Sequence, residues 1–219
     1  MCNNGCIEPA DGFLRTIREL CTENNIAFIL DEVITGFRLS LGGAQQYFGI
    51  EPDMAIFAKA IASGYPISAI VGKREFMELI ERSVVIHAGT MNTSNATVAA
   101  ALATIQVLEQ EQPYERMFSL GKKLMQGIKD AAAQAGHQLL VQGPGPMFNI
   151  AFTDLEKVND HRDTLTADKA KLGKFIAAMH NEGIRIIGRG LWYISAAHTE
   201  ADIDLAIEKA TVVLKEMNN

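Results

Sequence analysis

The chain has 219 residues and a net charge of −6 at pH 7, with 48% hydrophobic and 21% charged residues. This acidic charge argues against a dedicated nucleic-acid binder, and the apolar runs are far shorter than a membrane span, so we expect neither nucleic acid nor membrane as a partner. The three cysteines, Cys2, Cys6 and Cys21, form no CxxC pair. Their odd number predicts free thiols in a reducing compartment, which points to the cytoplasm.

Short apolar runs alternate with helical patterns in the first half of the chain. Apolar residues at helical spacing follow Asp11, which we expect to cap a helix. The patterns predict helices over residues 11–23 and 73–82, and strands over residues 26–30, 54–58 and 67–71. This alternation is typical of an α/β protein with a mainly parallel sheet covered on both faces.

Two long helices follow, over residues 93–111 and 114–135, and Pro113 separates them. The second helix is expected to bridge two domains, so we predict domains over residues 1–112 and 137–219 with a linking helix over 113–136. The last part has the pattern of an α+β module. Its predicted elements are strands over 138–142, 147–152, 184–187 and 191–195, helices over 168–182 and 199–217, and a polar loop over 154–166.

An acid and a lysine stand at the ends of two predicted strands. Asp31 closes the apolar run Phe28-Ile-Leu, and Lys59 lies within the run Met54-Ala-Ile-Phe-Ala-Lys-Ala-Ile-Ala. A buried lysine is costly unless it is paired or covalently modified, and open α/β sheets place their chemistry at the carboxyl ends of strands. The two residues suggest a Schiff-base lysine and the carboxylate that pairs with the pyridinium nitrogen of pyridoxal phosphate (PLP). A strand-end carboxylate and a surface lysine remain the alternative on spacing alone.

Other polar residues have both structural and functional interpretations. Arg189, between two glycines, is either a fork for a substrate carboxylate or a surface turn residue. Glu32 is expected to support packing on the strand face opposite Asp31, and His198 to be hydrogen-bonded structure. The remaining histidines expected to face solvent are His137, His161 and His180.

Five motifs in order resemble the class III aminotransferases, closest to the glutamate-1-semialdehyde 2,1-aminomutases and related β-amino-acid transaminases. The resemblance covers essentially the whole chain. The motifs are Asp31-Glu-Val-Ile-Thr-Gly-Phe-Arg38, Lys59 before Gly64, His87-Ala-Gly-Thr90, Gly145-Pro-Met-Phe148 and Tyr193-Ile-Ser-Ala-Ala-His-Thr-Glu-Ala-Asp-Ile-Asp204.

This resemblance implies the aspartate-aminotransferase fold (PLP fold type I), with residues 1–112 as the C-terminal portion of the PLP-binding large domain and a small α+β domain after it. It also implies that Lys59 carries the Schiff base and moves the proton, and that Asp31 holds the pyridinium nitrogen. Val33 would pack on the ring, and Thr90 would donate to the cofactor phosphate across a dimer interface. The substrate would be a small amino or keto acid.

Family members are much longer than this chain. The glycine-, serine- and threonine-rich turn that cradles the PLP phosphate would precede residue 1 in them. We therefore expect weak PLP binding, impaired amino-group transfer and self-association into a homodimer or a larger assembly. The alternative is a non-catalytic dimerising remnant or one subunit of a split enzyme.

Overall fold

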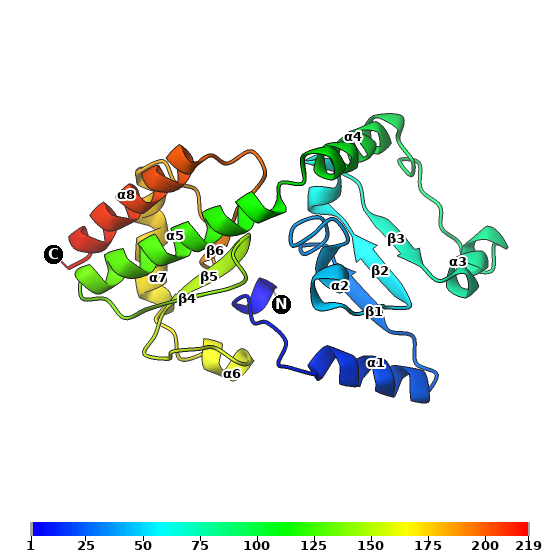
Figure 1. Cartoon of the computed structure of the whole chain (residues 1–219), viewed down its shortest axis with the longest axis horizontal. Coiled ribbons are helices and arrows are strands. Elements are labelled where there is room, and N and C mark those ends of the chain that lie inside the picture. The colour runs from blue at the N-terminus through cyan, green and yellow to red at the C-terminus, as the bar shows by residue number, and fades with distance from the viewer. Residues whose placement is uncertain (1, 219) are drawn as a thin grey trace. The chain divides into compact units, whose positions relative to one another are not determined.

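The computed structural model describes residues 2–218, which form two compact units (Figure 1). The first unit comprises residues 10–112, and the second comprises residues 2–9 and 113–218. Residues 2–9 thus group with the second unit, whereas the sequence predicts them in the first domain. The expected linking helix is also a full member of the second unit, because its apolar face forms part of that unit's core.

The first unit contains a three-stranded sheet with strand order β1-β2-β3. Its strands are β1 (Ile29–Glu32), β2 (Met54–Phe57) and β3 (Ala69–Gly72). Strand β1 runs parallel to β2, whereas β3 is antiparallel to β2. The α/β class is confirmed, but the sheet is mixed and not mainly parallel. The reason is the short link from β2 to β3, which lacks the long helical crossover that a parallel pair requires.

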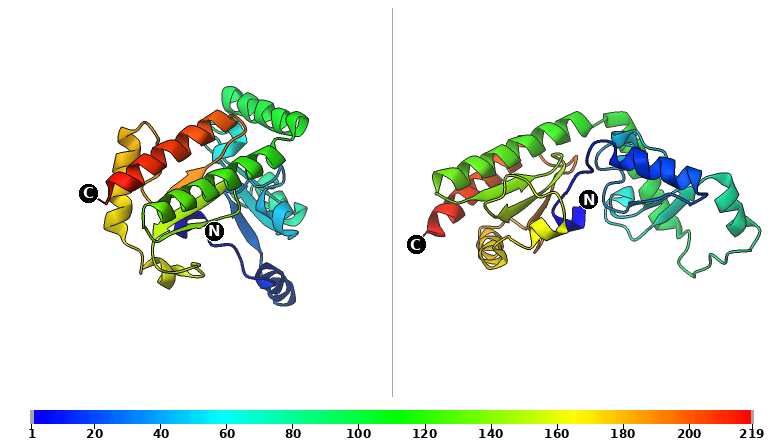
Figure 2. Two further views of the ribbon diagram at one scale, coloured as in Figure 1. Left: turned by 60° about the vertical axis from the view of Figure 1, so that its left-hand side comes forward. Right: turned by 90° about the horizontal axis from the view of Figure 1, so that it is seen from below.

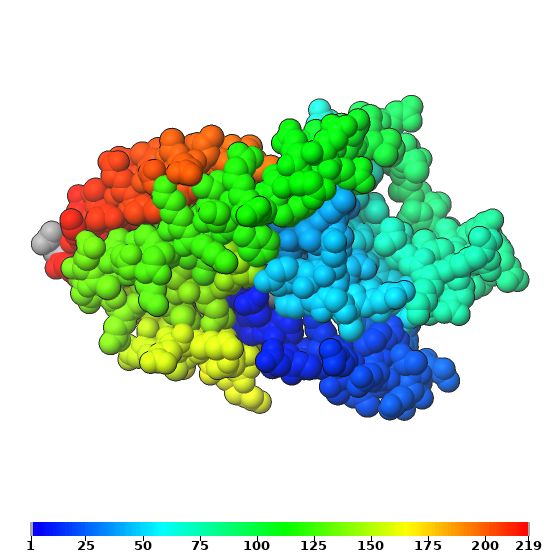
Figure 3. Space-filling view, viewed as in Figure 1, coloured from blue at the N-terminus to red at the C-terminus, as the bar shows by residue number. Residues whose placement is uncertain are grey.

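Helices surround this sheet within the first unit. They are α1 (Phe13–Glu23), α2 (Gly43–Phe48), α3 (Arg74–Glu81) and α4 (Asn95–Glu111). Helix α1 lies on the surface and has no buried residue (Figure 3). The expected cap at Asp11 is wrong, because α1 begins after Gly12 without a side-chain cap. The expected buried strand over residues 26–30 is also wrong, since β1 begins at Ile29 on the sheet edge with that side chain 50% exposed.

The second unit is an antiparallel sheet packed with helices (Figure 2). Its elements are η1 (Cys2–Asn4), α5 (Tyr114–Gln134), β4 (Leu139–Gln142), β5 (Met147–Phe152), α6 (His161–Thr164), α7 (Lys169–Asn181), β6 (Leu191–Tyr193) and α8 (Glu200–Glu216). The expected strand over 184–187 is reduced to one bridge between Ile187 and Leu191. The expected polar loop over 154–166 contains α6. Asp160 caps this helix, because its carboxylate accepts the N–H groups of Arg162 and Asp163.

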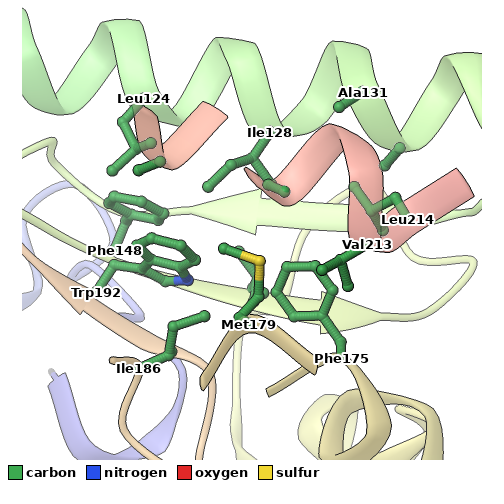
Figure 4. Close-up of a cluster of buried hydrophobic side chains, with 14 of the residues drawn as sticks. Leu124, Ile128, Ala131, Phe148, Phe175, Met179, Ile186, Trp192, Val213 and Leu214 are labelled. Atoms are coloured by element: carbon green, nitrogen blue, oxygen red, sulfur yellow. The ribbon is translucent and has the colours of Figure 1, made fainter. Parts of the chain in front are cut away.

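A continuous apolar core lies inside the second unit. Figure 4 shows side chains of α5 and α8 meeting those of β5, β6 and α7. Phe148 and Trp192 stack with their ring centroids 5.7 Å apart, and Phe175 and Met179 are fully buried beside them. Among residues 2–218, no helix is long and apolar enough to cross a membrane. None of the three cysteines forms a disulfide, as the sequence predicts.

Candidate functional site

The carboxyl ends of β1 and β2 carry the two residues that first suggested a site. Asp31 lies in β1 and pairs in register with Ile56 of β2, and Lys59 begins the short helix η2 (Lys59–Ala62) just after β2. Because β1 and β2 are adjacent and parallel, their carboxyl ends lie at the same edge of the sheet. The fold therefore brings Asp31 and Lys59 to one edge of the first unit.

The backbone at Lys59 is held in an uncommon conformation. Its φ of +49° is left-handed, directly after an extended residue, Ala58. Such a conformation costs a residue with a side chain roughly 1–2 kcal/mol and is often found at functional sites. The Lys59 side chain is exposed and not buried, as in the alternative of a surface lysine that the sequence left open. The strand ends at Phe57, two residues before Lys59.

The Asp31 carboxylate is oriented by its own backbone. Its Oδ1 accepts a hydrogen bond from the N–H of Val33 at 2.9 Å. This side-chain-to-backbone bond is the common way in which an aspartate forms a local turn. Val33 is half-buried and lies immediately after the strand. Asp31 itself is exposed and can meet a ligand.

Glu32 is the buried acid of this segment, and it supports packing as expected. It is 1% exposed, and its two carboxylate oxygens accept the N–H groups of Ala44 and Gln45, each at 2.8 Å. The hydroxyl of Thr35 donates to it as well. A side chain at Gly43 would lie 2.7 Å from Glu32 Oε2, so the glycine is needed for this approach. The carboxylate therefore fixes the N-terminus of α2 behind the site.

An ion cluster that the sequence analysis missed ties the start of this sheet together. Asp53, 6% exposed, accepts from Lys73 Nζ at 2.6 Å, from the N–H of Phe28 at 2.7 Å and from Arg18 Nη1 at 2.8 Å. The Lys73 ammonium, the Phe28 N–H and the Arg18 guanidinium hold the pKa of Asp53 well below its usual range. The pairing of β1 and β3 with β2 brings Phe28 and Lys73 to Asp53, and Arg18 reaches it from α1, so no local pattern could have indicated these partners.

Thr90 and Arg189 are the other two predicted site residues. Thr90 is exposed in the segment between α3 and α4 of the first unit. Arg189 lies in a turn of the second unit, where its Nη2 donates to Asn3 Oδ1 at 3.1 Å. Its carbonyl accepts from Asn149 Nδ2 at 2.7 Å. The roles predicted for Lys59, Asp31 and these two residues stay predictions.

The expectations for His198, His161 and His180 are confirmed, since the last two are exposed, and the one for His137 is wrong. His198 is structural as expected, since its Nδ1 accepts the N–H of Ser195 at 2.9 Å. His137 was expected to face solvent, but it is 8% exposed. Its Nε2 is 2.8 Å from the carbonyl of Leu214, and its Nδ1 is 3.1 Å from Lys171 Nζ. An ammonium has no lone pair, so Nδ1 accepts and Nε2 carries the proton.

The sequence matches the model of the Aminotransferase class-III family over residues 1–210. The chain belongs to this family. A glutamate-1-semialdehyde 2,1-aminomutase of Methanococcoides burtonii is 38% identical over 216 residues, which are 97% of this chain and 51% of that protein. A second aminomutase, from Desulfitobacterium hafniense, is 38% identical and matches 98% of this chain and 50% of its own length. The chain spans about half the length of the curated relatives it matches.

Solved structures show the same fold. An omega-transaminase from Sphaerobacter thermophilus superposes with a TM-score of 0.91 at 25% identity, over 98% of this chain and 50% of that one. The FumI protein of Sphingopyxis sp. MTA144, described as a PLP internal aldimine form, has a TM-score of 0.81 at 27% identity. That match covers 93% of this chain and 46% of FumI. The fold class expected from the resemblance, PLP fold type I, is confirmed.

Proposed function

We propose that this chain carries the lysine half of a PLP site for amino-group transfer between a small amino acid and a keto acid. The observation that carries this proposal is the placement of Asp31 and Lys59 at the carboxyl ends of two adjacent parallel strands. An amine and a carboxylate at one sheet edge match the two groups that PLP requires, one for its aldehyde and one for its ring nitrogen. Family membership and PLP in a related solved protein support the same chemistry.

The described residues fit this cofactor in several respects. Lys59 is exposed, so its amine can reach an aldehyde and bond to it. When bound, PLP supplies an electron sink for negative charge at the carbon next to the amino group. The Asp31 carboxylate, oriented by the Val33 N–H, would hold a proton on the ring nitrogen of bound PLP, and Lys59 Nζ would move a proton on and off the substrate carbon. Val33 would pack on one face of the ring.

The assembly is part of the proposal. We infer a homodimer in which Thr90 donates its hydroxyl to the cofactor phosphate held by the other copy, and we infer a cytoplasmic location. Light scattering of the purified chain tests whether it forms the homodimer. A monodisperse monomer at every accessible concentration would contradict the dimer.

A spectroscopic experiment tests cofactor attachment directly. Added PLP should give the purified chain a visible absorption band that borohydride abolishes, with the label retained on Lys59 in the digested protein. Lys59→Ala should lose the band, whereas the control Lys174→Ala, on an exposed position of α7 in the other unit, should keep it. No band in the wild type, or an unchanged band in Lys59→Ala, would favour a non-catalytic dimerising protein or a subunit whose partner holds the cofactor.

Affinity gives a second readout of the same site. The chain supplies the lysine and the ring-nitrogen partner, whereas in longer family members a phosphate cradle adds several charge-assisted hydrogen bonds of about 1.5–3 kcal/mol each. We therefore expect this chain alone to bind PLP more weakly than the longer transaminases, by absorbance titration. Asp31→Asn should shift the band to a form with an unprotonated ring and leave Lys59 labelling intact. An equal affinity would show that the chain carries its own phosphate site.

A further inference from the structure

The short helix η2, which begins at Lys59, is bounded by two residues in left-handed backbone conformations. Lys59 has a φ of +49°, and Ser63, directly after the helix, has a φ of +48°. Neither residue is a glycine, so each conformation costs free energy and persists only where neighbouring contacts hold it. The contacts at the Ser63 end therefore bear on the position of Lys59, because one short helix joins the two.

Backbone hydrogen bonds run along η2 from one end to the other. The Ala58 carbonyl accepts the N–H of Ile61 at 3.2 Å, and the Ala60 carbonyl accepts the N–H of Ser63 at 3.3 Å. Bonds between residues three apart wind the backbone tightly, so Lys59 cannot rotate independently of Ser63. A displacement of Ser63 is therefore transmitted to the proposed PLP lysine.

Apolar contacts hold one side of η2 without fixing its direction. Helix α4 lies against η2 (Figure 1). Ile61 and Ala62 are buried, and they form a cluster with Phe57 of β2 and Ala101 of α4. Burial of apolar surface is non-directional, so these contacts leave the rotation of η2 about its own axis unspecified. A directional contact has to set that rotation.

A pair of hydroxyl groups supplies a directional contact between η2 and α4. Ser63 Oγ and Thr104 Oγ1 are hydrogen-bonded at 3.1 Å. Thr104 Oγ1 also donates to the carbonyl of Ala100, one turn earlier in α4, at 2.8 Å, which favours one rotamer of the Thr104 side chain. Thr104 is half-buried and lies in the interior of this 17-residue helix, away from its ends. The pair thus ties the left-handed Ser63 to a firmly held point.

We propose that Ser63 and Thr104 are positioning residues for Lys59. Their hydroxyl pair fixes η2 on α4 and thereby holds the Lys59 amine in one orientation relative to Asp31, at the sheet edge that the two share. The chemical part of this inference rests on the proposed function, because orientation matters only for a ligand that is held at a second point. The anchoring of η2 does not rest on it.

Labelling of Lys59 in the full chain by two aldehydes tests this role, with peptide mass spectrometry as the readout. PLP with borohydride requires an oriented amine, whereas formaldehyde with cyanoborohydride requires only an exposed one. Thr104→Val keeps the shape and removes the hydroxyl, so it should slow PLP labelling about fivefold through the loss of one hydrogen bond and leave formaldehyde labelling unchanged. Thr104→Ser should restore the rate. The matched control Thr97→Val removes an α4 hydroxyl that donates to the Ser94 carbonyl, and it should label as the wild type does.

Two Ser63 variants separate the hydrogen bond from the backbone conformation. Ser63→Ala should slow PLP labelling as Thr104→Val does. The double variant should be no slower than either single variant, because the same bond is lost in all three. Ser63→Gly should also be slow, although glycine adopts a left-handed φ easily. A wild-type rate in Ser63→Gly, or fully additive effects in the double variant, would overturn the proposal.

Hydrogen exchange of residues 59–65 tests the anchoring without PLP. Thr104→Val should speed exchange there severalfold, and Thr97→Val should not. A wild type that takes no PLP on Lys59 would defeat the proposed function, and the exchange result would still decide whether the hydroxyl pair holds η2. Unchanged exchange in Thr104→Val would overturn the role of the pair whether or not PLP binds. A circular dichroism spectrum equal to that of the wild type excludes unfolding as the cause of slower labelling.

Discussion

The two units differ in how much apolar surface each one buries within itself. The second unit encloses a large core with many big side chains, including Phe148, Phe175 and Ile128. The buried cluster of the first unit is small and consists mainly of alanines, with Phe57 and Ile61 as its large members. Since burial of apolar area is the main driving force of folding, the second unit should hold its structure far more firmly.

The first unit instead exposes large apolar side chains. Ile86 is 86% exposed, Met91 75% and Leu102 65%, and both Phe13 and Leu20 of α1 are more than half exposed. Exposed apolar side chains mark an interaction site or an aggregation risk where they gather into a patch. The proposed PLP lysine thus belongs to the unit with more uncovered surface, which supports the proposal that another polypeptide completes it.

A matched pair of phenylalanine substitutions gives the largest expected contrast. Phe175→Ala removes a fully buried ring from the second unit and should lower its unfolding free energy by about 3–5 kcal/mol. Phe13→Ala removes a ring that is 53% exposed in the first unit and should cost far less. Urea unfolding can follow the second unit alone through Trp192, the single tryptophan of the chain. Equal losses for the two variants, each measured by circular dichroism, would contradict the difference between the cores.

Asp53→Asn tests the ion cluster that holds the first unit. The substitution keeps the shape but removes the charge that accepts from Lys73 and Arg18, so we expect a loss of about 2–3 kcal/mol. Hydrogen exchange of residues 26–32 by mass spectrometry should speed up, and Trp192 unfolding should not change. Slower exchange, or a change confined to the second unit, would show that the cluster does not stabilise β1.

The same cluster predicts a dependence on pH. The folded pKa of Asp53 lies below its ordinary value of 3.8, chiefly because of the hydrogen bond from Lys73, so the stabilisation is present above about pH 4 and is lost as the pH falls further. The difference in exchange between wild type and Asp53→Asn should therefore be full at pH 7 and should narrow below pH 4. A difference that grew on acidification would have the wrong sign for a depressed carboxyl pKa.

Local patterns predicted most helices and strands but not the contacts between them. The short apolar run over 54–58 predicts β2, because such a run is typical of a buried strand. Asp31 lies near the end of β1, as the sequence predicts. The apolar run of β3 reads the same in both directions, so only the short link from β2 could have indicated the antiparallel pairing. The burial of His137 and the partners of Asp53 depend on residues far away in sequence, so no spacing along the chain indicates them.

Thr199→Ala tests a smaller, local contribution in the second unit. The Thr199 side chain accepts the N–H of Asp202, and the Asp202 carboxylate accepts the N–H of Thr199 at 2.8 Å, which together form a capping box for α8. Loss of the hydroxyl should lower the unfolding free energy by about 1 kcal/mol, measured by urea unfolding through Trp192. Thr199→Ser keeps the acceptor and should restore most of it. No recovery in Thr199→Ser would mean that the methyl group, and not the cap, carries the effect.

The smallest expected effect on folding comes from the most exposed apolar side chain of the first unit. Ile86→Ser removes a side chain that is 86% exposed, so the unfolding free energy of the chain should change by less than about 0.5 kcal/mol. If a second copy covers this surface, the same substitution should weaken self-association in light scattering, because the apolar contact is then lost in the assembly alone. Ile128→Ser, in the core of the second unit, is the opposite case and should destabilise the chain strongly. An Ile86→Ser variant that unfolds as readily as Ile128→Ser would show that residue 86 is buried within the chain. The proposed difference in buried apolar surface between the two units would then be wrong at the residue that carries it most strongly.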